Sequence, residues 1–141
     1  MSDAAQIERV AIHEAGHAVA ALALGLEVHA VHLAGRVTLR RHSPSEPADL
    51  LLFYLSGVEA ERLAFGSPPP GGCKLDTYAA RRAGFEMIGD LTATDALVES
   101  SQSQVRQLLS DRWLDVDRVA LALLTGTGTL SGAELEALVA P

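Results

Sequence analysis

The sequence predicts a mainly α fold of the α+β class, with about five helices and one small β-hairpin. Long segments repeat apolar residues at helical spacing, and each segment is flanked by residues that typically begin or end a helix. Two shorter segments, Val28–Leu33 and Val37–Arg41, interleave apolar and polar residues on either side of a short turn. The chain has 141 residues, of which 48% are hydrophobic. We therefore expect residues 1–141 to form a single domain around one core.

The first predicted helix runs from Asp3 to Leu24. Asp3 is the expected N-cap, Gln6 follows three residues later as in a capping box, and Gly25 is a natural C-terminal stop. The two strands come next, with Ala34–Arg36 as the tight turn between them. We expect the histidines near this hairpin to face solvent, with contact to a substrate as the alternative: His29, His32 and His42.

The middle of the chain predicts two helices joined by a rigid loop. His42–Pro47 is a loop because of its Ser and Pro content, and Ala48–Phe65 forms the second helix, which Gly66 ends. Ser67–Lys74 contains three prolines and two glycines, so it cannot be regular structure. We expect this loop to deliver the next residues to a site. The third helix then extends from Asp76 to Ile88.

The rest of the chain predicts two more helices. Gly89–Thr94 is expected as a turn, and the pattern leaves the following segment, to about Ser100, unassigned. A long fourth helix covers Ser103–Leu124, and Thr125–Leu130 is a loop. The residues Ser131–Glu134 form a capping box that opens a short last helix, which ends near Val139.

The residues His13-Glu14-Ala15-Gly16-His17 carry the clearest chemical signal, the pattern H-E-x-x-H. On a helix, residues four apart lie on one face about one turn apart, so both imidazoles can bind one Zn²⁺. Glu14 lies beside the first imidazole and can take a proton from a water whose pKa the metal lowers toward about 7. The motif therefore predicts a catalytic zinc site in a zincin-like helical domain.

The flanking residues favour a metal site over a solvated or purely structural pair of histidines. Apolar residues precede and follow the motif, so the helix should be buried on most sides. A buried helix rarely keeps two imidazoles and a carboxylate without partners, because burying unpaired polar groups is costly. Gly16 is a poor helix former, about 1 kcal/mol worse than Ala, and we expect another segment to approach closely there.

A third protein ligand must come from outside the motif, and four residues are candidates: Asp76, Glu59, Glu61 and Cys73. The two glutamates lie two residues apart on a helix, so at most one of them can face the site. Cys73 is chemically a good zinc donor. Asp76 is expected where the proline-rich loop meets a helix N-terminus, so N-capping would also explain it.

Composition and charge exclude several classes of function. The formal net charge is −7 and the pI is about 5.1, which argues against a nucleic-acid-binding surface. The longest uninterrupted apolar stretch, near Ala18–Leu26, is far shorter than the ~20 residues of a membrane span. The N-terminus lacks the basic region of a secretory signal, and the single cysteine, Cys73, cannot form an internal disulfide. We expect a cytoplasmic protein with no membrane and no nucleic-acid partner.

Four blocks of the sequence together resemble the peptidase domain of the FtsH-type zinc metalloproteases, which are ATP-dependent membrane proteases. His13–Ala18 (HEAGHA) matches the zinc helix of that family, and Leu55–Gly66 (LSGVEAERLAFG) is similar to its second block. Leu75–Ala83 (LDTYAARRA) resembles its third block. Leu121–Leu138 is similar to its C-terminal pattern of a leucine helix, Thr-Leu and a Gly-acidic-Leu helix. Block order and approximate spacing agree over nearly the whole chain.

The resemblance implies a role for each matching residue. His13 and His17 correspond to zinc ligands, Glu14 to the general base and Asp76 to the third ligand, whereas Glu61 corresponds to a nearby supporting acid. The implied cofactor is Zn²⁺, and the implied activity is that of a zinc metalloendopeptidase. In that mechanism, zinc polarises the scissile carbonyl and holds the attacking water, and Glu14 passes the proton to the leaving amine.

The chain also departs from the family. We expect no AAA ATPase module and no membrane anchor, the segment between Ala18 and Gly57 is shorter, and Pro68–Cys73 replaces the usual loop beside the metal. The expected activity is therefore ATP-independent hydrolysis of peptides or unfolded protein segments, bound along the exposed edge of the Val28–Arg41 hairpin. The alternative is an inactive zinc-binding or assembly module, in which the metal only stabilises the fold. Because the resembled proteases act as rings and Leu50–Leu55 is unusually apolar, a homo-oligomer is a further expectation.

Overall fold

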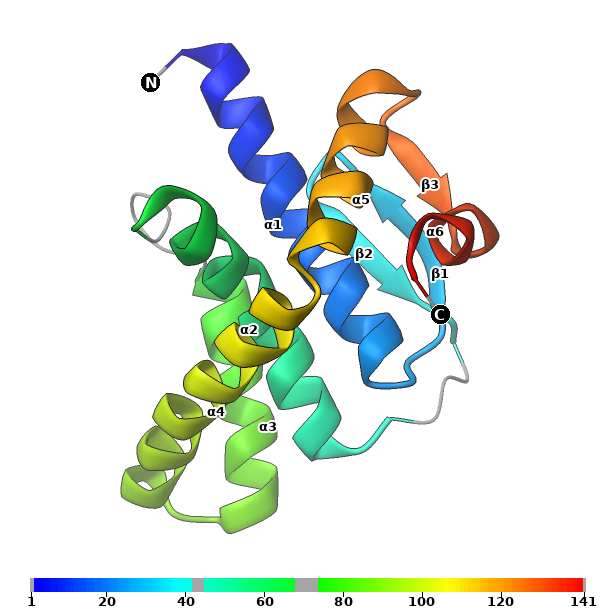
Figure 1. Ribbon diagram of the computed structural model, residues 1–141. Coiled ribbons are helices and arrows are strands. Elements are labelled where there is room, and N and C mark those ends of the chain that lie inside the picture. Colours follow the sequence, from blue (N-terminus) through cyan, green and yellow to red (C-terminus); the bar gives the residue numbers. More distant parts are fainter. Residues whose placement is uncertain (1, 42–44, 68–73, 141) are drawn as a thin grey trace.

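The computed structural model describes residues 2–41, 45–67 and 74–140, and it confirms a mainly helical α+β fold (Figure 1). Six helices and a three-stranded antiparallel sheet make up these residues. In chain order the elements are α1 (Asp3–Ala23), β1 (Val28–His32), β2 (Arg36–Leu39), α2 (Pro47–Phe65), α3 (Lys74–Ile88), α4 (Leu91–Asp111), α5 (Trp113–Thr125), β3 (Thr129–Ser131) and α6 (Gly132–Leu138).

Helix α1 lies at the centre of the fold, with α2 and α5 packed along it and β1 against it. Its ten buried residues all fall between Ala11 and Ala21. Small residues let α2 approach this half closely. A Cβ on Gly16 would lie 2.5 Å from the Cβ of Ala60 and 2.7 Å from the carbonyl oxygen of Ser56. The close approach expected at Gly16 is therefore confirmed, and the neighbouring segment is α2.

The helix ends follow local capping rules, with one correction. Ser2, not Asp3, is the N-cap of α1, since its Oγ accepts the N–H of Ala5 at 3.2 Å and Asp3 falls in the first turn. Pro47 opens α2 at a position where its missing N–H is not needed. Gly66 ends α2 with φ of 77°, as predicted, in a conformation that favours glycine.

The predicted hairpin is confirmed, and it is part of a larger sheet. β1 pairs with β2 and also with β3, which gives the strand order β2-β1-β3. Val31 faces Val37 on one side and Leu130 on the other. The prediction of a loop over Thr125–Leu130 is wrong for its last two residues, which belong to β3. A three-residue strand is too short to show periodicity, and its pairing with β1 is a tertiary contact.

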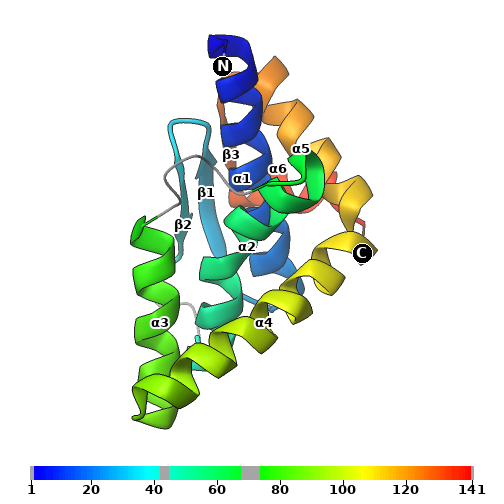
Figure 2. The ribbon, with the colours of Figure 1, turned by 90° about the vertical axis from the view of Figure 1, so that its left-hand side faces the viewer.

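The second half of the chain requires two further corrections. Gly89–Thr94 is not one turn, because the carboxylate of Asp90 caps α4 by accepting the N–H of Ala93 at 2.7 Å. The single helix predicted over Ser103–Leu124 is two helices, α4 and α5, which meet at Arg112 and point in different directions (Figure 2). Apolar residues keep helical spacing through the junction, so the pattern does not reveal the bend. The predicted capping box of the last helix, between Ser131 and Glu134, is confirmed.

The site is positioned where β2 and α3 come together in front of α1. In Figure 2, β2 lies next to the first turn of α3, and residues of both elements line one cavity. β2 pairs only with β1 among the described strands, so it is an edge strand of the sheet. Across residues 2–41, 45–67 and 74–140, the helices are all too short or too polar to cross a membrane.

Candidate metal centre

Three side chains from two helices bring their donor atoms together. His13 and His17 lie one turn apart on α1, and their Nε2 atoms are 3.1 Å apart. Asp76, in the first turn of α3, brings its Oδ2 to 3.0 Å from the Nε2 of His13 and 3.1 Å from that of His17. The two imidazoles and the carboxylate predicted as ligands therefore form one compact group.

The other ring nitrogens determine where the lone pairs point. The Nδ1 of His17 lies 2.8 Å from the carbonyl oxygen of Phe53, which can only accept a hydrogen bond, so Nδ1 carries the proton. The Nδ1 of His13 lies 2.6 Å from the Oε1 of Glu61 and donates to that carboxylate in the same way. In the neutral rings, both Nε2 lone pairs then face each other and the carboxylate of Asp76. Only a proton or a metal ion can make this arrangement favourable.

The dimensions of the triangle fit a small divalent cation. In a tetrahedral zinc site with bonds of about 2.0–2.1 Å, neighbouring donors lie about 3.3 Å apart. The separations of 3.0 and 3.1 Å in this triangle differ from that value by only a few tenths of an ångström. His13, His17 and Asp76 can therefore hold a metal ion.

Helix α2 supplies the back wall of the site through a glycine. A Cβ on Gly57 would overlap the Nε2 of His13, and it would lie 2.5 Å from the Nε2 of His17. Only a residue without a side chain leaves both nitrogens free to face Asp76. Ser56, the preceding residue, is fully buried and donates its hydroxyl to the carbonyl oxygen of Phe53 at 2.6 Å, beside the Nδ1 of His17.

The two glutamates of α2 point in different directions, as predicted. Glu61 faces the site, where its Oε1 accepts from His13 and its Oε2 accepts from the guanidinium of Arg9 at 2.9 Å. Glu59 lies away from the site, and Arg106 of α4 donates to its Oε2 at 3.0 Å. Glu61 is thus a supporting acid for His13, and Glu59 is not a ligand. Cys73, the remaining candidate, lies outside the described residues.

The charge balance of the site favours a cation. Burial lowers the pKa of His13, but hydrogen bonds to Asp76 and Glu61 and the charges of Glu14 and Asp76 outweigh it and raise the pKa from 6.5 to about 9. Without a metal, the proton on His13 therefore satisfies the converging lone pairs at neutral pH. A metal ion that binds there must displace this proton.

Glu14 is buried beside the triad and keeps one free oxygen. Its residue exposure is only 3%, and its Oε2 has no hydrogen-bond partner among the described residues. Burial raises the pKa of Glu14, while the two histidines act in the opposite direction. The triad and Glu14 line a cavity of about 220 Å³ together with residues of the hairpin, α2 and α3: Gly35, Arg36, Val37, Phe53, Tyr54 and Leu75.

Sequence reasoning missed three residues of this site, Arg9, Phe53 and Gly57, although their spacing was a usable signal. Arg9 precedes His13 by four residues, so Arg9, His13 and His17 share one face of α1. Phe53, Gly57 and Glu61 have the same spacing on α2. The two rows lie against each other. Their equal spacing is visible in the sequence, but their contact depends on how the helices pack.

His29 and His32 of the hairpin take no part in the triad. His29 is exposed, as expected, and His32 is half-buried with its Nδ1 3.5 Å from the Oγ1 of Thr129. Neither residue lines the cavity in front of the triad. His42, the third of them, falls outside the described residues.

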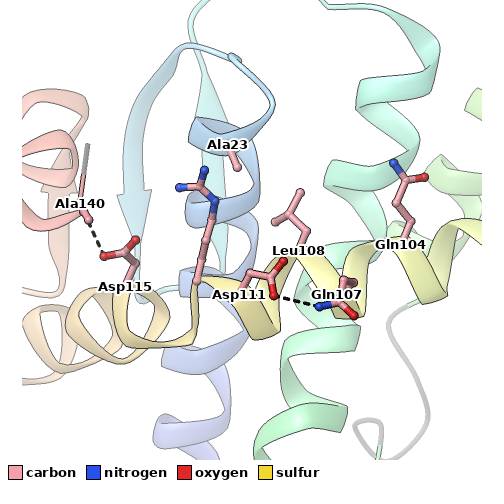
Figure 3. A pocket seen from close by; sticks show the side chains of 8 residues that line it. Ala23, Gln104, Gln107, Leu108, Asp111, Asp115 and Ala140 are labelled. Carbon is pink, nitrogen blue, oxygen red and sulfur yellow. Dashed lines mark hydrogen bonds between the residues drawn. The ribbon is translucent and has the colours of Figure 1, made fainter.

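A larger cavity, of about 750 Å³, lies at the junction of α4 and α5, and no residue of the triad lines it (Figure 3). Its acidic side chains already have partners. Gln107 donates to Asp111 at 2.9 Å, and Asp115 accepts the N–H of Ala140 at 3.1 Å. Asp115 thereby fastens the end of the described chain to the start of α5. The three candidate ligands and Glu14 all line the smaller cavity instead.

Comparison of the chain with protein-family models and with curated proteins gives no match.

Proposed function

We propose that this chain is a zinc-dependent metalloendopeptidase of the FtsH type, with a zincin-like arrangement of its H-E-x-x-H helix. One observation carries the proposal: the nitrogen and oxygen donors of His13, His17 and Asp76 lie 3.0–3.1 Å apart, next to the buried, unpartnered oxygen of Glu14. Two imidazoles and one carboxylate are the ligand types of many catalytic zinc sites.

Each residue of the site has a definite task in this proposal. A bound zinc ion would supply a Lewis acid that polarises a carbonyl and lowers the pKa of water. Glu14 would accept the proton of the attacking water on its free Oε2 and deliver it to the leaving amine. Glu61 and the carbonyl of Phe53 would fix the rings of His13 and His17 so that each Nε2 keeps its lone pair toward the metal.

The position of β2 as an edge strand of the described sheet supports a peptide as the substrate. Gly35, Arg36 and Val37 line the same cavity as the triad, so the start of β2 borders the candidate metal site. An extended segment that pairs with β2 would carry its own carbonyl groups past the site. Strand pairing reads the backbone and not the side chains, which suits peptides and unfolded protein segments. We therefore propose that the substrate enters as an added strand.

The alternative is a zinc-binding module without activity, in which the metal only links α1 and α3. In such a structural site, a fourth protein ligand closes the coordination shell. The cavity of about 220 Å³ in front of the three donors favours an open position instead. Glu14 would also be costly in a purely structural site, because its carboxylate is buried with one oxygen unpartnered. These two observations make the enzyme the better proposal.

The experiment that tests the proposal compares the zinc-loaded wild type with Glu14→Gln, using an unfolded protein as substrate. We expect cleavage to fall at least 100-fold, because general-base catalysis typically contributes ~10²–10⁴-fold. Zinc content should stay the same, since Glu14 is not a ligand. Glu136→Gln, which changes an exposed glutamate of α6, is the matched control and should cleave normally. Equal cleavage by wild type and Glu14→Gln would refute the role of the base.

A further inference from the structure

Helix α5 carries an exposed row of leucines on the side that faces away from the core. Its buried residues pack toward α1, the helix that it lies along. On the opposite side, Leu114, Leu121 and Leu124 are 63%, 61% and 40% exposed. Leu121 follows Leu114 by seven residues and precedes Leu124 by three, so all three lie on one face of the helix. A row of this kind is typical of a protein–protein contact, whereas a single exposed leucine is ordinary.

Two opposite charges lie in the middle of this row. Asp117 and Arg118 are both exposed and stand between Leu114 and Leu121. Arg118 lies 3.7 Å from Asp115 of the same helix, and its side chain is still 49% exposed. In both directions from the point between the two charges, a charge comes first and a leucine follows three residues later. Reversing the helix exchanges the acidic and the basic position, so the row is complementary to itself.

We propose that α5 is a dimer interface, on which α5 of a second copy lies antiparallel around a two-fold axis between Asp117 and Arg118. Asp117 then faces Arg118 of the second copy. Leu114 faces Leu121 of the second copy in the same way. Because the axis is two-fold, each contact occurs twice, which gives two ion pairs flanked by two pairs of leucines. The order of the charges favours a second copy over an uncharged apolar partner, which would leave both charges without a counterpart.

This surface differs from the one that the sequence suggested for self-association. The apolar segment Leu50–Leu55 was the basis of that expectation, but Leu51, Leu52, Phe53 and Leu55 are buried in the core. No residue of α5 lines the triad cavity, so the pairing uses no part of the candidate metal site. The dimer therefore does not depend on the proposed function, and its test needs no catalytic activity.

The length of α5 limits the strength of the pairing. Its 13 residues span about 20 Å, and two helices of this length bury less area than the ~1,600 Å² of a standard interface. We therefore expect a reversible dimer with a Kd on the order of 10–100 µM. Sedimentation equilibrium of the full chain, from about 1 µM to about 1 mM, spans that range and measures the Kd.

Exchange of the two charges tests the register of the pairing. Asp117→Arg and Arg118→Asp each place like charges across the axis, and we expect each to raise the Kd at least ~tenfold. The double variant Asp117→Arg/Arg118→Asp restores opposite charges in exchanged order, so its Kd should return to within about threefold of the wild-type value. A double variant as weak as the two single variants would overturn the proposed pairing.

Substitution of a leucine tests the apolar part of the interface. Leu114→Ser removes apolar contact at both ends of the dimer, and we expect it to raise the Kd at least ~tenfold. Leu91→Ser is the matched control, since Leu91 is 65% exposed and belongs to α4, outside this row. That variant should dimerise like the wild type, and circular dichroism checks that both variants keep their helices. A wild type that is monomeric at every concentration, or association that survives Leu114→Ser, would overturn the interface.

Discussion

Hydrogen bonds from the Nδ1 atom of each imidazole fix the orientation of the two rings. His17 donates from Nδ1 to the Phe53 carbonyl, and His13 donates from Nδ1 to Glu61, which Arg9 also binds. These bonds fix the ring orientation and leave both Nε2 lone pairs pointing at Asp76. Loss of such an outer partner typically lowers metal affinity about 10–100-fold. We therefore expect the hydrogen bonds that link Arg9, Glu61 and His13 to control zinc affinity.

The two glutamates of α2 provide a matched pair for testing this idea. We expect Glu61→Gln to weaken zinc binding about 10–100-fold, because the ring of His13 loses its charged acceptor. Glu59→Gln should leave zinc affinity unchanged and lower the free energy of unfolding, because Arg106 loses its buried partner. Competition with a chelator of known affinity measures the first effect, and urea unfolding measures the second. Equal zinc affinity in the two variants would contradict the assignment.

The pKa of His13 gives a prediction for the metal-free protein. Its folded-state value is raised from 6.5 to about 9, so the protonated ring stabilises the fold. This stabilisation is fully present below pH 6.5 and is lost as the pH rises through about 9, and its size is about 3 kcal/mol. Urea unfolding in the presence of a chelator, from pH 6 to pH 10, should show this loss in the wild type. His13→Gln should lack it, and identical pH profiles for both proteins would disprove the role of His13.

At the scale of elements, the site is the contact between two helix faces. The row Arg9, His13 and His17 on α1 lies against a row of α2 with the same spacing. Gly57 stands at the centre of the α2 row and leaves space for both imidazoles. Helix α3 then brings Asp76 to the open side. The arrangement of the three donor atoms therefore depends on the close packing of α1 against α2.

Gly57→Ala tests this dependence. A Cβ there would overlap the Nε2 of His13, and α2 or the imidazole must move. We expect zinc binding to be lost at micromolar zinc and the free energy of unfolding to fall by about 1–3 kcal/mol, as for other overpacked sites. Gly84→Ala in α3 is the control, since its Cβ would come no closer than 3.2 Å to another group, the methyl of Thr94. That variant should bind zinc normally. Normal zinc affinity in Gly57→Ala would show that the glycine is not required.

For the molecule as a whole, the candidate metal site lies between a strongly packed part and a weakly packed one. The motif half of α1 is buried between α2, α5 and the sheet. By contrast, only three of the 15 residues of α3 are buried, namely Ala80, Ala83 and Gly84. In the first turn of α3, the Oδ2 of Asp76 meets both histidines of α1. A metal ion that binds Asp76 should therefore order α3 more than the rest of the molecule.

Zinc should accordingly stabilise the whole chain and order α3 most. Free zinc at 100 times its Kd should raise the free energy of unfolding by about 2.7 kcal/mol. On removal of zinc by a chelator, hydrogen exchange should accelerate more in the first turns of α3 than in the core half of α1. In Asp76→Asn, which lacks the charged ligand, both effects of zinc should be much smaller. Uniform protection along the chain would indicate that the metal does not link these two helices.

The sequence predicted the elements better than their junctions. The first three helices and the hairpin are present close to their expected bounds, because their apolar spacing and terminal residues are local properties. β3 and the bend at Arg112 were not predicted. A three-residue strand exists only by pairing with β1, and the bend interrupts a helix whose apolar spacing continues through it. In both places, contacts between distant segments decide the structure.

What the sequence determined by itself is the chemistry within one helix. The spacing of His13, Glu14 and His17 fixes two imidazoles on one face and a carboxylate beside them, because the helix repeat is the same in every protein. Only the tertiary structure decided which acid completes the group. Asp76 lies 63 residues after His13 and reaches it because α3 packs against α2. Glu61 and Glu59 differ in sequence by two positions, yet the packing of α2 turns one toward the site and the other toward Arg106.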